Sequence, residues 1–135
     1  MFSPVIQGTM ELPEEVKVFL LESYENLDRV EDDLLILEKD PGNVERLNSV
    51  FRAIHTIKGN SGFLGLKGLE TVCHRGETVL DRLRSGKLKL SADLASVLLE
   101  LVDLIRSFLS GVEDSGEEPK LDSSTVIGKL APFVA

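Results

Sequence analysis

The sequence contains no tryptophan, one tyrosine and only six phenylalanines among its 135 residues. With so few aromatic side chains, leucine, isoleucine and valine must form most of the hydrophobic core. Cys73 is the single cysteine, so no disulfide can form within the chain. A lone thiol is typical of proteins from a reducing compartment, and we therefore expect a cytoplasmic location.

Basic residues are also scarce, because 15 lysines and arginines face 23 aspartates and glutamates and give a net charge of −8. A binder of nucleic acid or of an anionic membrane surface needs a basic face, so the charge argues against both. Long apolar runs are missing, and the N-terminal stretch MFSPVIQGTM lacks the positive and apolar regions of a signal peptide. The composition favours partners that are proteins or small molecules.

The sequence does contain hydrophobic residues repeated at the helical period in four successive segments. Pro13 precedes the first segment, the turn Asp40-Pro41-Gly42 ends it, and Asn43 is placed to cap the second. A third segment runs to about residue 84, and Ser91 is placed to cap a fourth that ends at Gly111. Four amphipathic helices with short connections predict an all-α fold, an antiparallel four-helix bundle.

This pattern divides the chain into three parts. Residues 1–12 lack periodicity and are expected to form an N-terminal arm, and residues 13–111 form the bundle. Residues 112–135 are expected to form a polar loop, followed by a short fifth helix near 123–130. At 135 residues, the chain has the length of one domain.

The stretch FRAIHTIKGNSGFLGL, residues 51–66, places two glycines inside a helical segment, although glycine costs about 1 kcal/mol there relative to alanine. On a helix, His55 lies on the flank of the apolar face, Lys58 lies one turn away, and Gly59 and Gly62 share the histidine's own stripe. The glycines would leave the imidazole open to a bulky partner. Close helix packing, or the end of the helix, is the alternative explanation for them.

The next helix carries Glu70, His74, Glu77 and Asp81 along one flank. If the two helices are antiparallel neighbours, Glu77 can accept a hydrogen bond from Nδ1–H of His55 and leave Nε2 as a nucleophile. Lys58 can pair with an anionic group that arrives at Nε2. This set of residues suits a histidine that receives a phosphoryl group. The chain has neither a GxxxxGK[ST] nor a GxGxxG motif, so ATP and magnesium are expected on another domain.

HTIKGNSGFLG (residues 55–65) is followed, nineteen residues after His55, by HRGE (residues 74–77). Together with FRAIHTIKG and LDRLRSGKLKLS, these motifs resemble the histidine phosphotransfer (HPt) domain at the N-terminus of chemotaxis-type histidine kinases, the CheA family. The resemblance covers roughly residues 13–111. One departure is Gly76 inside HRGE, a mid-helix glycine that is expected to loosen the geometry of His74 and Glu77.

The resemblance implies that His55 is phosphorylated, that Lys58, His74 and Glu77 support it, and that Gly59 and Gly62 are the small residues beside it. It also implies two partners: a histidine kinase catalytic domain, usually acting in trans within a dimer, and a CheY-like response regulator that receives the phosphoryl group on an aspartate. The chain is then a phospho-acceptor without an ATP site of its own. It is either part of a larger histidine kinase or a stand-alone relay protein.

Two interpretations from other classes compete with this one. A helical protein-interaction module explains the bundle but not the glycines beside His55. A metal-binding bundle could use Cys73, His74, Glu77 and His55 as zinc ligands. However, Cys73 and His74 point about 100° apart on one helix, and the single HxxE lacks the paired Glu-x-x-His motifs of a di-iron bundle. The metal site is the less favoured interpretation.

Overall fold

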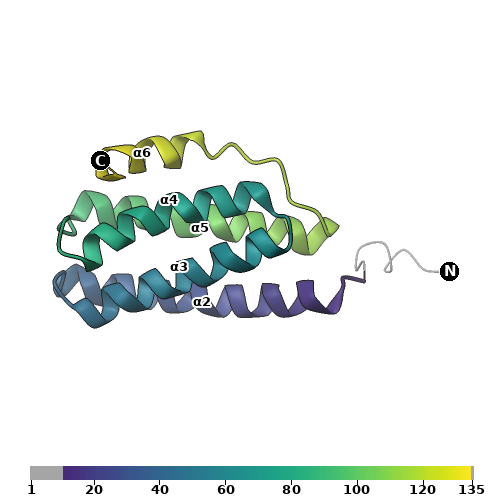
Figure 1. Cartoon of the computed structure of the whole chain (residues 1–135), viewed down its shortest axis with the longest axis horizontal. Coiled ribbons are helices and arrows are strands. Elements are labelled where there is room, and N and C mark those ends of the chain that lie inside the picture. Colours follow the sequence, from purple (N-terminus) through teal and green to yellow (C-terminus); the bar gives the residue numbers. More distant parts are fainter. Residues whose placement is uncertain (1–10, 135) are drawn as a thin grey trace.

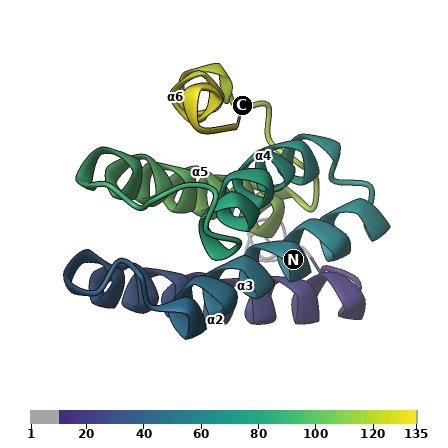
Figure 2. The same cartoon turned by 60° about the vertical axis from the view of Figure 1, so that its left-hand side comes forward.

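The computed structural model describes residues 11–134, which contain five α-helices and no strand. Helices α2 (Glu14–Lys39), α3 (Val44–Phe63), α4 (Lys67–Arg84) and α5 (Ala92–Ser115) lie side by side as an antiparallel bundle (Figure 1). Helix α6 (Ser124–Val134) packs on α4 and α5, on the side away from α2 and α3 (Figure 2). The predicted four-helix bundle with a short fifth helix is therefore confirmed. The expected arm, 1–12, lies largely outside the described residues.

The helices start and stop where local chemistry favours it. The side chain of Asn43 accepts a hydrogen bond from the backbone N–H of Arg46 at 3.1 Å, and Ser91 accepts one from Leu94 at 3.1 Å. Both are the N-caps that the sequence predicts, and each satisfies an N–H that the first turn leaves unpaired. Pro13 precedes α2, whose first turn carries Glu14 and Glu15. Short-range interactions therefore determine where these helices begin.

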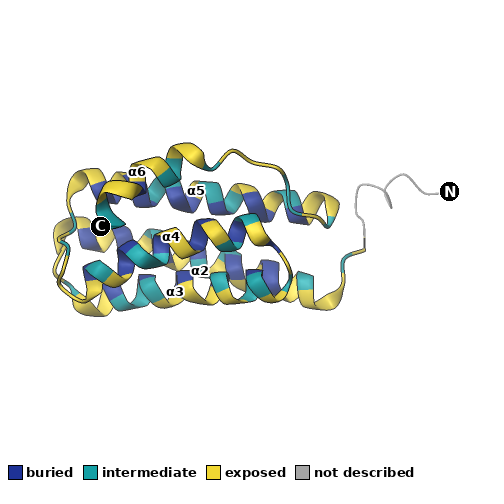
Figure 3. Ribbon diagram, turned by 45° about the horizontal axis from the view of Figure 1, so that its top comes forward, coloured by how far each residue is buried: buried dark blue, intermediate teal, exposed yellow. Residues whose placement is uncertain are grey.

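Aliphatic side chains build the core, as the shortage of aromatics requires. One face of each bundle helix is buried and the opposite face is exposed (Figure 3). The largest fully buried side chains are nearly all leucine and isoleucine, including Leu27, Leu37, Ile54, Ile57, Leu69, Leu80, Leu101 and Ile105. The core therefore holds α3 and α4 in fixed register, which matters for the site described below.

The expected end of the fourth helix at Gly111 is wrong, because α5 continues to Ser115. The helix ends at Gly116, whose φ of 77° is left-handed and suits a residue without Cβ. Gly111 has another purpose: a Cβ there would overlap the ring of Pro119, which lies against the helix. The polar connection consequently begins at residue 116 rather than 112.

The C-terminal part also packs more closely on the bundle than the sequence indicates. Leu130 of α6 is 1% exposed, and α6 extends to Val134, beyond the expected end near 130. In the connection before α6, the Glu118 carboxylate accepts hydrogen bonds from the backbone N–H groups of Gly68 (3.0 Å) and Leu69 (2.7 Å). Leu66, the N-cap of α4, has no capping side chain, so Glu118 supplies the cap from fifty residues away.

We expect Glu118→Ala to lower the free energy of unfolding by about 1 kcal/mol, the usual cost of losing an N-cap. Urea unfolding followed by far-UV circular dichroism would measure it. The matched control is Glu117→Ala, because Glu117 is exposed and contributes only backbone groups to the nearby hydrogen bonds. Equal stability of the two variants would show that the Glu118 contact does not hold α4.

Candidate functional site

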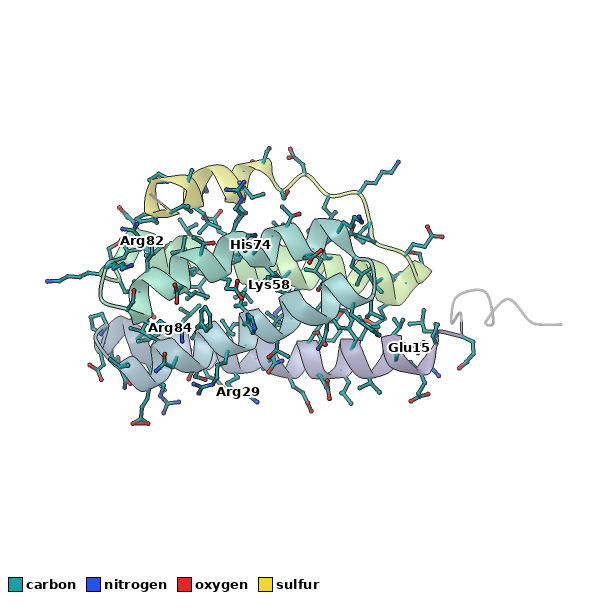
Figure 4. All side chains as sticks on the ribbon, viewed as in Figure 1. Glu15, Arg29, Lys58, His74, Arg82 and Arg84 are labelled. Atoms are coloured by element: carbon teal, nitrogen blue, oxygen red, sulfur yellow. The ribbon has the colours of Figure 1, made fainter. Side chains whose placement is uncertain are left out.

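The candidate site lies along the seam between α3 and α4, which run antiparallel. Phe51, His55, Lys58 and Gly62 follow one another at three- or four-residue spacing and so share one stripe of α3. Residues further along α3 contact residues earlier in α4, as expected for antiparallel helices. Phe51 contacts Arg84, Lys58 contacts Glu77, and Gly62 lies against Glu70. Figure 4 labels Lys58 at this seam. The short turn between the helices places the two functional stripes face to face.

His55 stands on the surface of this seam, with 59% of its side chain exposed. Its Nδ1 is hydrogen-bonded to Oε2 of Glu77. A carboxylate can only accept, so in the neutral ring the proton resides on Nδ1 and Nε2 keeps its lone pair. Within residues 11–134 no group hydrogen-bonds Nε2. The free nitrogen is therefore available to a reactant from outside.

Glu77 links two side chains of α3, those of His55 and Lys58. Its side chain is 13% exposed, and its second oxygen, Oε1, accepts a hydrogen bond from Nζ of Lys58 at 2.6 Å. Burial would raise the pKa of Glu77, but the hydrogen bonds and charges of Lys58 and His55 outweigh it and lower the pKa. Glu77 is thus an ionised carboxylate at neutral pH and holds both partners at once.

The two glycines on the histidine stripe have different surroundings. A Cβ on Gly59 would meet no atom within 4 Å, so the surface next to His55 is open there. A Cβ on Gly62 would lie 2.6 Å from Oε2 of Glu70, so the space beside Gly62 is already used by that carboxylate. An access role for Gly59 stays a prediction, whereas Gly62 makes room for a side chain of α4.

His74 is exposed but takes no part in the network of His55, Lys58 and Glu77. Its backbone carbonyl accepts a hydrogen bond from Thr78, and its ring makes none with any described residue. It borders an open pocket of about 540 Å³ that is also lined by Lys58, Glu70 and Arg75. Figure 4 places it on α4, farther from the seam than Lys58. Its supporting role remains a prediction.

Gly76 has a packing function that its place in the motif does not reveal. Helix α4 is continuous through it, and a Cβ at this position would overlap the Leu101 side chain of α5. The expectation that Gly76 loosens the geometry of His74 and Glu77 stays a prediction. The glycine lets α5 approach α4 closely, directly behind Glu77.

The arrangement of Cys73 argues against the zinc interpretation. Its side chain is fully buried in the core, whereas His74 next to it is exposed. Burial also raises the pKa of the Cys73 thiol to about 12, which disfavours a free thiolate at neutral pH. In the part of the chain from 11 to 134, no three histidine, cysteine or acidic side chains are grouped to hold a metal.

A stack of side chains next to His55 was not predicted from the sequence. The Phe51 and His55 rings are parallel within 11°, with centroids 5.8 Å apart, and Cζ of Arg84 lies 3.7 Å from the Phe51 centroid. The available signal was spacing: Phe51 precedes His55 by one helical turn, and Arg84 follows Glu77 by two.

An antiparallel helical bundle that presents one oriented, exposed imidazole on its wall has the architecture of a histidine phosphotransfer module. The chain belongs to the Hpt domain family, which it matches over residues 14–108. It is 38% identical over 108 residues to the sensor histidine kinase CheAY of Helicobacter pylori. That alignment covers 80% of this chain and 13% of the relative, so the chain spans a small part of the relative's length.

Solved structures agree with this assignment. The CheA phosphotransferase domain from Thermotoga maritima has a TM-score of 0.70 and 36% identity, covering 73% of this chain and 94% of that one. The phosphorylated P1 domain of CheA3 from R. sphaeroides, solved in complex with CheY6, has a TM-score of 0.83 and 25% identity, covering 90% and 95%. The family and fold inferred from the motifs are thus confirmed.

No helix within residues 11–134 is long and apolar enough to cross a bilayer.

Proposed function

We propose that this chain is the phosphotransfer domain of a chemotaxis-type signalling kinase. His55 accepts a phosphoryl group from ATP bound to a kinase catalytic domain and passes it to an aspartate of a CheY-like response regulator. The observation that carries the proposal is the hydrogen bond from Nδ1 of His55 to Glu77, which leaves Nε2 free on an exposed helix face. The R. sphaeroides relative, phosphorylated and bound to CheY6, supports the choice of partner.

The first step is a displacement at phosphorus. The Nε2 lone pair of neutral His55 forms a bond to the γ-phosphorus of ATP, and the bond from that phosphorus to the β–γ bridging oxygen breaks. ADP leaves with the bonding electrons. The phosphorylated ring retains its Nδ1 proton and becomes cationic. Glu77 stabilises this cation because its carboxylate already accepts from Nδ1.

In the second step an oxygen is the nucleophile and Nε2 of His55 is the leaving group. An aspartate oxygen of the response regulator attacks phosphorus, the N–P bond breaks, and its electrons return to Nε2. The neutral ring with its proton on Nδ1 is restored. Lys58 supports both steps, since its ammonium group has three protons and donates only one of them to Glu77. The others can pair with phosphoryl oxygens.

ATP and magnesium enter this proposal as the equipment of the kinase domain, and the phosphoryl acceptor is all that this chain supplies. Whether the kinase domain belongs to the same polypeptide or to another does not change the chemistry at His55. The expected cytoplasmic location also belongs to the proposal, because ATP-dependent signalling to a response regulator takes place there.

A two-stage labelling experiment tests the proposal. The chain is incubated with the catalytic domain of a CheA relative and γ-labelled ATP, and a CheY-type regulator is then added. We expect acid-labile label on the chain, followed by its loss to the regulator but not to a regulator lacking its phospho-acceptor aspartate. If the relative's own phosphotransfer domain is labelled in a parallel reaction and this chain is not, the proposed function is wrong.

A further inference from the structure

The side chains next to His55 form a continuous series that the proposed chemistry does not use. Asp81 accepts a hydrogen bond from Nε of Arg84 at 2.9 Å. The Arg84 guanidinium lies over the Phe51 ring, with its carbon 3.7 Å from the ring centroid, within the range of a cation–π contact. Phe51 is in turn stacked parallel to His55, with 5.8 Å between centroids, which is typical of offset stacking.

One hydrogen bond is not enough to fix the direction of an imidazole. With Nδ1 of His55 bonded to Glu77, the ring can still turn about the line that joins these two atoms. A contact with the face of the ring removes this freedom, because only one ring plane keeps both contacts. Phe51 supplies that face, with an interplanar angle of 11°. The hydrogen bond and the stack together determine where Nε2 points.

Helix α4 controls both restraints. Glu77 and Arg84 are seven residues apart, so they lie two turns apart on the same face of α4. Glu77 holds the imidazole directly, and Arg84 holds the phenyl ring that holds the imidazole. The arginine is itself anchored by Asp81, one turn before it on the same helix. A change in the register of α4 against α3 would therefore disturb both restraints.

We propose that Phe51 and Arg84 are positioning residues for phosphoryl transfer. They confine the His55 ring to the plane in which Nε2 faces solvent, and neither residue touches the phosphoryl group. The effect on rate rests on the proposed function, whereas the restraint on the ring exists in the unphosphorylated protein and can be measured without any transfer.

Phe51 also packs partly against the core, so a simple structural role must be separated from positioning. Phe51→Leu retains an apolar side chain of similar size but loses the flat face, and Phe51→Tyr retains the ring. Arg84→Gln removes the cation over the ring. Lys67→Gln removes one positive charge from an exposed position on the same helix, away from the pocket beside Lys58, and is the matched control.

The experiment has two readouts for each variant. NMR three-bond couplings and nuclear Overhauser contacts give the rotamer of the His55 ring in the unphosphorylated protein. Phosphoramidate, a small phosphoryl donor that transfers its phosphoryl group to histidine with release of ammonia, gives the rate without a kinase domain. The donor removes any contribution from docking of a protein partner.

We expect Phe51→Leu to give an averaged His55 rotamer and a rate lower by about threefold to tenfold, since aromatic contacts of this kind are modest. Arg84→Gln should lower the rate by about twofold. Phe51→Tyr and Lys67→Gln should match the wild type in both readouts. A single wild-type rotamer in Phe51→Leu would overturn the proposal, as would a Phe51→Tyr variant as impaired as Phe51→Leu. If the wild type accepts no phosphoryl group at all, the proposed function fails. The His55 rotamer in the Phe51 variants would still show whether Phe51 restrains the ring.

Discussion

Replacing His55 with glutamine is expected to abolish phosphoryl acceptance while leaving the bundle folded. The amide nitrogen of glutamine has no available lone pair, so labelling by a kinase domain should fall by about a thousandfold or more, as when a nucleophile is removed. His55 is 59% exposed and lies outside the core, so the free energy of unfolding should change by no more than about 0.5 kcal/mol. Incorporation of labelled phosphate and a urea unfolding curve measure the two effects.

His74→Gln is the matched control, because the chain contains only these two histidines. The His74 ring is exposed and makes no hydrogen bond with any residue in the range 11–134, so its loss should leave most of the labelling intact. Label that persists in His55→Gln and disappears in His74→Gln would contradict the assignment of the phosphorylated residue. Loss of label in both variants would mean that His74 contributes to the reaction from its pocket.

The features that could be predicted from the sequence are those set by neighbours along the chain. Hydrophobic spacing indicated the four bundle helices, and the capping side chains Asn43 and Ser91 marked two of their starts. The faces that meet between α3 and α4 could also be predicted, because a short turn fixes which faces of adjacent antiparallel helices meet. The pairing of His55 with Glu77 follows from that register, whereas the hydrogen bond from Lys58 to the same carboxylate was not predicted.

What could not be predicted depends on contacts between distant residues. Gly111 resembles a helix stop, and only the return of the chain at Pro119 shows that it serves close packing inside α5. Gly76 likewise resembles a flaw in α4 until Leu101 is seen in the space that a side chain would occupy. Local propensity cannot distinguish a glycine that ends a helix from one that admits a neighbouring group. The distinction requires the packed structure.

The site itself shows the same division. Periodicity placed four acidic or imidazole residues on one flank of α4. Glu77 was predicted to be the partner of His55, and it is the one that reaches the ring. Asp81 pairs with Arg84 instead, and Glu70 lies against Gly62. A helix flank spans several turns, whereas a hydrogen bond tolerates a few tenths of an ångström, so periodicity alone selects a stripe and not a partner.

Glu77→Gln is expected to slow phosphoryl acceptance by about tenfold to a hundredfold, the range typical for loss of a carboxylate that orients a metal-bound imidazole. The reason lies in the donors around it. Lys58 can only donate, so the oxygen of the new side-chain amide would turn toward its ammonium group and the amide NH₂ toward Nδ1 of His55. The imidazole would then carry its proton on Nε2 and lose the nucleophilic lone pair. Nitrogen NMR shifts of His55 report this tautomer, and labelling by the kinase domain reports the rate.

Glu70→Gln is the control, since Glu70 lies two turns earlier on α4 and its carboxylate lies against Gly62 rather than His55. It should leave the His55 tautomer and the rate of phosphoryl acceptance unchanged. An equal loss in both variants would indicate that general negative charge on α4, not the hydrogen bond, matters.

The free energy of unfolding supplies an independent check. The folded-state pKa of Glu77 is lowered from 4.5, so its contribution is complete above that pH and is lost as pH falls through the lower folded value. The stability advantage of the wild type over Glu77→Gln should therefore shrink on acidification below pH 4.5, and urea unfolding at several acidic pH values would reveal it.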